Sequence, residues 1–290
     1  EYAKAIPYLE SYEGKKGRLN NTDYYLLGYA YYKQKDYTTA ISYFNKIIDG
    51  NNSVSQNAYY HLGECYLRTE SKAEALNAFR NASQMDFDKT IQQDAALNYA
   101  KLSYDIGNPY QSVAKVIQDY LNKYPTDVNK DELNSLIVNS YISSKDYQGA
   151  LNFLEDNPES EDFLKVAYLR GTQLFKQQKY TEAKQLFEMA QKKDNPFLAE
   201  TIFWHAESDF RLGNYEKALE GFEKFIQTPG AMTSQEYKLI DYHKAYAYFD
   251  LKDYNLAGGH FDRFIESNPD SSELLSDAYW GDLDLLLLDL

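Results

Sequence analysis

The chain has 290 residues, and its 44 acidic and 30 basic residues give a formal charge of -14 at pH 7. A phosphate backbone would be repelled by this charge, and no run of Lys or Arg offers a basic patch, so nucleic acid is not expected as a partner. The single cysteine, Cys65, excludes a disulfide framework and a multi-cysteine metal site within this chain. No stretch of about 18 apolar residues occurs, so direct insertion into a membrane is not expected.

A short pattern with a small residue at its centre recurs from the first residues of the chain almost to its end. The copies are EYAKAIPYL (1–9), KDYTTAISYF (35–44), SKAEALNAF (71–79), NPYQSVAKVI (108–117), KDYQGALNFL (145–154), QKYTEAKQLF (178–187), GNYEKALEGF (213–222) and KDYNLAGGHF (252–261). The central small residues, 33 to 39 positions apart, are Ala5, Ala40, Ala75, Val113, Ala150, Ala183, Ala218 and Ala257. A period of this length predicts a solenoid of two-helix units.

Each unit is predicted to contain two amphipathic helices. Helix A precedes the recurring pattern, as in TDYYLLGYAYYKQ (22–34), where apolar residues recur every three or four positions. A polar turn follows, and helix B then carries the small residue. Gly28 and Gly63 would each cost about 1 kcal/mol inside helix A relative to alanine, which indicates that helix B comes close to helix A at these points. Pro109 behind Asn108 predicts the first position of a helix.

In chain order, these elements predict one all-α array over residues 1–290. Its predicted parts are a partial repeat at 1–20, repeats at about 21–54, 55–92, 93–129, 130–162, 163–197, 198–236 and 237–270, and a partial or capping helix at 271–290. The chain lacks an initiator Met and begins inside the repeating pattern, so a fragment or a processed product is expected.

The pattern resembles that of tetratricopeptide-repeat (TPR) proteins. The first full copy matches the TPR pattern at Tyr24, Leu27, Gly28, Tyr31, Tyr37, Ala40 and Phe44, and the next at Tyr59, Leu62, Gly63, Tyr66, Ala75, Phe79 and Ala82. The weakest copy has Lys101 at the Gly position and Val113 at the Ala position. The resemblance covers nearly all of the chain and implies a right-handed TPR superhelix of antiparallel helix pairs. It does not name a function, because TPR arrays serve many unrelated tasks.

The resemblance also implies that the fifth and ninth positions of helix A face a concave groove where ligands lie. The candidate partner-binding residues at these positions are Tyr25, Tyr29, Tyr60, Glu64, Asn98, Asn139, Tyr168, Phe203, Glu207, Tyr242 and Tyr246. An aromatic row of this kind can take an extended or helical peptide. Alternatively, neighbouring repeats cover these side chains. Since no fifth position carries Lys, and Glu64 and Glu207 would repel an acidic tail, a clamp for a chaperone's C-terminal carboxylate is not expected.

No catalytic or cofactor site is expected. His61 and Cys65 are four residues apart on one helix, but two ligands do not make a metal site. His205 and His243 lie on successive A helices, where the pattern supplies no nucleophile for a catalytic pair. Solvated or packing histidines are the simpler interpretation.

The C-terminal segment SDAYWGDLDLLLLDL (276–290) allows two interpretations. Its leucines form a cap over the last repeat, or they form an edge that joins further repeats or a second copy of the chain. The second interpretation predicts self-association through this helix.

These features favour a non-catalytic scaffold that binds a partner protein or peptide. The Tyr-, Asn- and Lys-rich repeats resemble the large TPR proteins of Bacteroidota, which implies a periplasmic location and a role in cell-envelope assembly, with a cytoplasmic location as the alternative. Two other functions stay open. The array is the regulatory or substrate-recruiting arm of an enzyme whose catalytic domain lies outside this chain, or it is a self-assembling structural module.

Overall fold

The fold is entirely α-helical within the residues that the computed structural model describes, namely 2–15, 17–47, 50–267 and 273–288, with side chains of the last helix described for 274–281. These residues form sixteen α-helices and two 3-10 helices, without a β-strand. Contacts between Cα atoms divide the chain into two compact units, Glu1–Ser140 and Tyr141–Leu290, with the boundary inside α8. Each unit has its own clusters of buried apolar residues.

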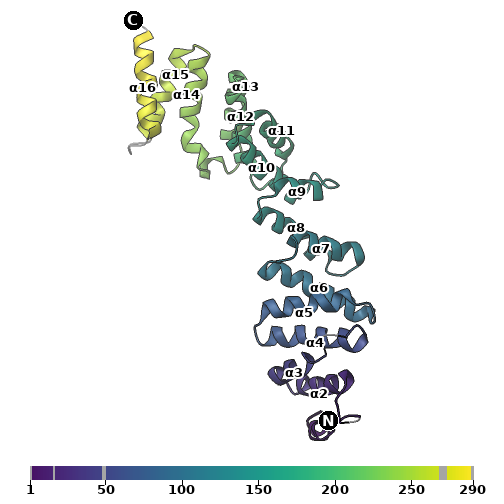
Figure 1. The fold of residues 1–290 in the computed structure, drawn as a ribbon. Helices are drawn as coiled ribbons and strands as arrows, with labels where there is room; N and C mark the ends of the chain where they lie inside the picture. The colour runs from purple at the N-terminus through teal and green to yellow at the C-terminus, as the bar shows by residue number, and fades with distance from the viewer. Residues whose placement is uncertain (1, 16, 48–49, 268–272, 289–290) are drawn as a thin grey trace. The chain divides into compact units, whose positions relative to one another are not determined.

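The first unit contains seven helices and most of an eighth. They are α1 (Tyr2–Glu10), α2 (Asn21–Lys33), α3 (Tyr37–Phe44), α4 (Ser53–Arg68), α5 (Lys72–Gln84), α6 (Lys89–Ile106), α7 (Val113–Lys123) and α8 (Lys130–Ser143). Helix α2 packs on α3, α4 on α5, and α6 on α7, and α3 and α5 also contact the helix that follows them (Figure 1).

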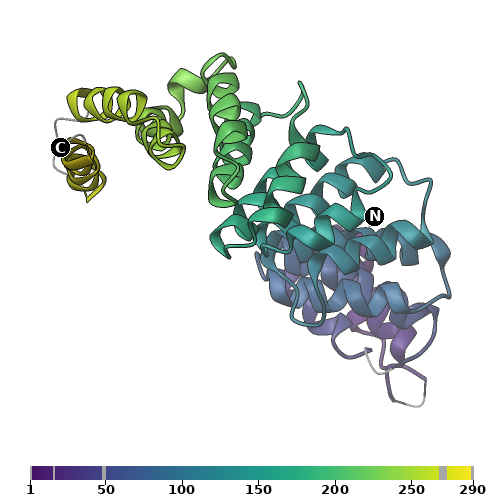
Figure 2. The same cartoon turned by 90° about the horizontal axis from the view of Figure 1, so that it is seen from above.

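The second unit repeats this arrangement. Its helices are α9 (Tyr147–Phe153), α10 (Glu161–Lys176), α11 (Tyr180–Ala190), α12 (Leu198–Arg211), α13 (Tyr215–Ile226), η1 (Ala231–Thr233), η2 (Glu236–Leu239), α14 (Ile240–Asp250), α15 (Tyr254–Ser267) and α16 (Glu273–Leu288). The pairs α10 and α11, α12 and α13, and α14 and α15 pack against each other (Figure 2). The predicted all-α fold of paired helices is thus confirmed. Among the described residues, no helix combines the length and apolar character needed to cross a membrane.

Small residues let the two helices of a pair approach closely. A Cβ atom on Gly63 would lie 2.7 Å from the ring of Phe79, which is fully buried. The same clash would occur between Gly28 and Phe44 and between Gly171 and Phe187. The predicted close approach is confirmed, and its neighbour is the phenylalanine of helix B rather than the alanine.

The pair α12 and α13 makes a different close contact, between two small residues. Ala206 occupies the glycine position of α12, and the glycine lies instead on α13 as Gly221. A Cβ atom on Gly221 would lie 2.6 Å from the Cβ atom of Ala206. In this pair the close approach of the helices therefore depends on the missing side chain of Gly221 on helix B.

The turn from helix A to helix B has one conformation in six pairs. Its first residue has a positive φ of 58° to 63° at Lys35, Glu70, Lys145, Gln178 and Lys252, and of 78° at Gly213. Each of these residues lies two positions before helix B begins. After α2, the N–H of Asp36 donates to the carbonyl oxygen of Tyr31 at 3.1 Å and closes the turn.

The third full copy corrects two predictions from the sequence. Helix α7 begins at Val113 behind the cap Ser112, so Pro109 is not the first position of a helix. In the other full copies, helix B begins three residues before its buried alanine. Counted in the same way from the start of α7, the residue equivalent to that alanine is Val116 and not Val113. Tyr120 then takes the place of the buried phenylalanine. The reason is a longer connection, in which the Asn108 side chain accepts a hydrogen bond from the Tyr110 N–H at 2.8 Å.

Candidate partner-binding surface

Helix α2 is fixed at its start by a capping box, which sets the direction of its tyrosines. The Asn20 side chain accepts from the N–H groups of Thr22 and Asp23, and the Asp23 carboxylate accepts from the N–H of Asn20 at 2.9 Å. Residues four apart then share one face of the helix. Tyr25 and Tyr29 accordingly stack, with ring centroids 5.9 Å apart.

Five aromatic side chains from α2 and α4 form one group, which we call the tyrosine cluster. Its members are Tyr25, Tyr29, Tyr32, Tyr60 and His61. The imidazole of His61 is central, because its centroid lies 5.2 Å from that of Tyr29 and 4.9 Å from that of Tyr32. All five side chains are partly exposed. The cluster thus combines a well-packed base with ring surface that a partner can reach.

Two carboxylates border the tyrosine cluster. The Nδ1 of His61 donates to Glu64 at 2.7 Å, and the Tyr60 hydroxyl donates to Asp94 of α6 at 3.4 Å. Burial, followed by the charges of Glu64 and Asp94, raises the pKa of Tyr60 to about 12. Burial and Glu64 likewise raise the pKa of Tyr32. The hydroxyls of Tyr32 and Tyr60 therefore stay protonated beside these carboxylates.

The second unit carries a smaller pair of tyrosines on α14. Tyr242 and Tyr246 lie with their centroids 5.0 Å apart, and both hydroxyls donate to Asp277 of α16 at 2.6 and 2.7 Å. These hydrogen bonds lower the pKa of Asp277. Burial, then the bond to Asp277, raises the pKa of Tyr242. The pair ties α14 to α16 and remains partly exposed.

The other candidate residues lie in different surroundings. Tyr168 stacks on Phe197 at 4.9 Å, and burial raises its pKa to about 12. Asn98 is partly buried and donates to the Asp94 carbonyl of its own helix, and Asn139 is exposed. The structure thus brings Tyr25, Tyr29, Tyr60 and Glu64 together, and Tyr242 with Tyr246.

Phe203 and Glu207 are buried rather than open to a partner, each 1% exposed. Phe203 packs edge-on against Phe225 at 5.4 Å. The Glu207 carboxylate lies 2.8 Å from Nε of Arg211 and 2.8 Å from Nδ1 of His243. In this pair of helices, the fifth and ninth positions hold the core together.

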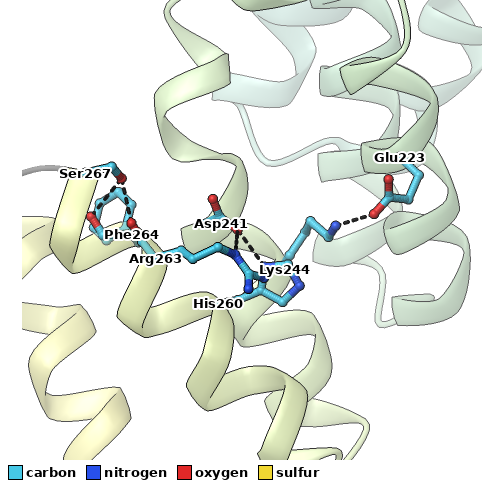
Figure 3. Close-up of polar contacts among 7 residues, drawn as sticks. All are labelled: Glu223, Asp241, Lys244, His260, Arg263, Phe264 and Ser267. Atoms are coloured by element: carbon cyan, nitrogen blue, oxygen red, sulfur yellow. Dashed lines mark hydrogen bonds and ion pairs between the residues drawn. The ribbon is translucent and has the colours of Figure 1, made fainter.

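Polar contacts also join α13, α14 and α15 (Figure 3). Asp241 of α14 lies 2.6 Å from Nδ1 of His260 and accepts from Nε of Arg263 at 3.1 Å. Burial alone would raise the pKa of Asp241, but these partners hold it below its usual value. Lys244 pairs with Glu223 of α13. We assign these residues to the packing between helices.

Three residues of these two separate surfaces, Tyr32 and His61 in the first unit and Asp277 in the second, were not among the candidates from the sequence. Tyr32 lies seven positions after Tyr25, on the same helix face, and Asp277 lies 35 positions after Tyr242, in the same register. Both could have been found by extending the periodicity. His61 was considered only as a metal ligand, and its central place in the cluster depends on contacts between successive A helices, which the sequence does not show.

Residues that can ligate a metal do not gather in the described part of the chain. No group of three or more His, Cys, Asp or Glu side chains there is placed to hold a metal ion. Cys65 is fully buried, and burial, followed by the charge of Glu64, raises its pKa to about 12. We assign Cys65 to the packing of α4, because its side chain belongs to a cluster of buried apolar residues.

Two family models match parts of the sequence. Residues 1–82 match the model described as anaphase-promoting complex, cyclosome, subunit 3, and residues 200–229 and 241–271 match the model of the tetratricopeptide repeat. No curated protein sequence is significantly similar to the chain.

Solved structures share the fold at low sequence identity. One is a chain in the structure of Naa15/Naa10 bound to HypK-THB, with a TM-score of 0.55 and 14% sequence identity. The match covers 92% of the present chain but only 39% of the Naa15/Naa10 structure's chain. The C-terminal part of a TPR repeat-containing protein from Cytophaga hutchinsonii has a TM-score of 0.48 and 17% identity, covering 87% of this chain and 98% of that one. The TPR2AB domain of yeast Sti1 in complex with pHSP90 has a TM-score of 0.42 and 14% identity, covering 91% and 98%. The family-model matches, together with the paired helices and their glycine–phenylalanine contacts, show that the chain is built from tetratricopeptide repeats.

Proposed function

We propose that the chain is a non-catalytic scaffold that binds a segment of a partner protein on the tyrosine cluster. The observation that carries this proposal is the partial exposure of four neighbouring tyrosines on α2 and α4. Tyrosine supplies a large contact area at a low cost in conformational entropy, and its hydroxyl can bond to a partner's backbone. Tyr242 and Tyr246 offer a second, smaller surface of the same chemistry in the other unit.

The structural relative with a TM-score of 0.55 is consistent with such a role. It comes from a structure in which Naa15/Naa10 is bound to HypK-THB, an assembly of several proteins. A shared fold at 14% identity does not transfer that partner to this chain. The partner has to be sought by experiment.

The test is affinity capture from soluble and envelope fractions with the parent chain and with a variant carrying Tyr25→Ala, Tyr29→Ala and Tyr60→Ala. A control variant carries Tyr104→Ala and Tyr110→Ala, two exposed tyrosines outside the cluster. We expect one partner to be retained by the parent and the control and lost from the triple variant. If all three capture the same proteins, the tyrosine cluster is not the binding surface. Circular dichroism melting curves establish that each variant is folded.

The envelope setting is part of the same proposal. It rests on the resemblance of the repeats to envelope TPR proteins of Bacteroidota. Fractionation of cells with an antibody against the chain would test it, since recovery with periplasmic markers supports the setting and recovery with cytoplasmic markers opposes it. The self-association predicted from the leucines of the last helix stays a prediction, because those side chains lie outside the described residues.

A further inference from the structure

Lys33, the last residue of α2, shows how the tyrosine cluster interacts with a positive charge. Its ammonium nitrogen lies 4.8 Å from the ring centroid of Tyr29 and 5.2 Å from that of Tyr32. Both distances are within the roughly 6 Å over which a cation is attracted to an aromatic face. Lys33 is exposed and could point into water, yet it lies over two rings. Hydrogen bonding with Tyr29 raises the pKa of Lys33, which keeps it charged.

The carboxylates beside the cluster favour a cation at the same place. Glu64 is 30% exposed and is held by His61, whose ring packs against Tyr29 and Tyr32. Asp94 is exposed and meets the Tyr60 hydroxyl. Ring faces and carboxylates attract positive charge together. An acidic segment would be repelled here, and a neutral apolar segment would gain no attraction from the two carboxylates.

The shape of the surface indicates a polypeptide rather than a small cation. Tyr25, Tyr29 and Tyr32 follow one another along α2, and Tyr60 continues the row on α4, the next A helix. An open row of partly exposed rings contacts a chain over several residues, whereas a small cation needs an enclosed site.

We propose that the tyrosine cluster binds the ammonium or guanidinium group of a lysine or arginine in a partner's polypeptide segment, in place of Lys33. The inference rests on the proposed function, because it names the chemistry of the partner for the same surface. Lys33 then acts as an internal competitor that an incoming cation displaces.

The test uses three fluorescein-labelled Gly-Ser peptides that carry two arginines, two lysines or two citrullines, titrated against the full chain by fluorescence anisotropy. Citrulline has the shape of arginine without its charge. We expect the arginine peptide to bind about tenfold more tightly than the citrulline peptide, a difference within the range of cation–π contacts. Equal affinity of the two would overturn the inference. The lysine peptide shows whether ammonium is accepted as well as guanidinium.

Variants separate ring contact from general attraction to a negative chain. Tyr29→Leu should weaken the arginine peptide severalfold, and Tyr29→Phe, which keeps the ring face, should restore it. Lys33→Ala should tighten binding, whereas Lys115→Ala, an equal charge change at an exposed site of α7, should not. If both lysine variants tighten binding equally, the attraction is general and the inference fails.

The outcomes also separate this inference from the proposed function. If neither charged peptide binds while capture of a partner still depends on Tyr25, Tyr29 and Tyr60, the scaffold proposal stands and the cation inference is wrong. If the arginine peptide binds as expected and the captured partner loses affinity when its own basic residues are neutralised, both are supported.

Discussion

The fifth and ninth positions of helix A are used differently on α4 of the first unit and on α12 of the second. On α4, Tyr60 and Glu64 are partly exposed and belong to a surface, whereas on α12, Phe203 and Glu207 are each 1% exposed. The difference comes from the next A helix. His243 of α14 reaches back to Glu207, while Glu64 is contacted by His61 of its own helix. A position in the repeat therefore does not decide exposure by itself, because the following helix determines what remains uncovered.

The largest expected effect on stability comes from truncating Phe203, the buried residue at the fifth position of α12. Phe203→Ala should reduce the free energy of unfolding by about 3–5 kcal/mol, because a fully packed aromatic ring leaves a cavity. Tyr29→Ala, on the partly exposed surface, should cost about 1 kcal/mol or less. Urea denaturation followed by circular dichroism measures both, and equal losses would contradict the contrast between the units.

The two glutamates at the ninth position, Glu64 and Glu207, should also differ in how much they contribute to stability. Glu207→Ala leaves the largely buried His243 without its carboxylate, whereas the exposed Arg211 turns to water, and a loss of about 1–3 kcal/mol is expected for an unsatisfied buried polar group. Glu64→Ala should change stability by about 1 kcal/mol at most, since its partner lies near the surface. Tryptophan fluorescence suits the Glu207 variant, because both tryptophans of the chain, Trp204 and Trp280, belong to the second unit. A Glu207 variant as stable as the parent would show that the pair is dispensable.

A double substitution can exchange the two small residues that meet between α12 and α13. Gly221→Ala should cost about 1–3 kcal/mol, because the new Cβ atom meets Ala206. Adding Ala206→Gly should remove the clash between the two Cβ atoms and recover most of the loss. The four stabilities form a double-mutant cycle. Purely additive effects would mean that the two positions do not constrain each other.

The smallest expected effect is on the pH dependence of stability in the first unit. Tyr120 donates to Asp127 at 2.6 Å, and this bond, with that from Asn129, lowers the pKa of Asp127 from its ordinary 3.8 to about 2. Because the folded state binds the proton less well than the unfolded chain, this contribution is complete above about pH 4 and is lost as the pH falls to about 2. Tyr120→Phe should flatten the stability profile in that window, and an unchanged profile would contradict the assignment.

The sequence predicts most of the fold because the repeat carries its own packing rules. The glycine at the eighth place of helix A and the buried alanine of helix B are local signals, and the contacts of Gly28 and Gly63 follow from them. The prediction was wrong at α7, where Val113 was assigned the place that Val116 occupies. A longer connection shifted the register by three residues, and no local residue type marks that shift.

The candidate surface was predictable only in part. The periodicity located Tyr25, Tyr29 and Tyr60, which the structure brings together. It could not show that Phe203 is covered, because the covering residues come from α13 and α14. It also gave no sign that Lys33 lies over the rings, since that contact depends on the orientations of flexible side chains.

The single buried thiol offers a way to follow local unfolding of the first unit independently of the second. Cys65 is the only cysteine of the chain, is fully buried on α4, and has a raised pKa, so a maleimide or disulfide reagent should not modify it in the folded state. Its labelling rate would then report how often α4 separates from its neighbours, while the tryptophans report on the other unit. Labelling kinetics in the presence of a bound segment would show, without an engineered probe, whether occupation of the tyrosine cluster closes the helices beneath it.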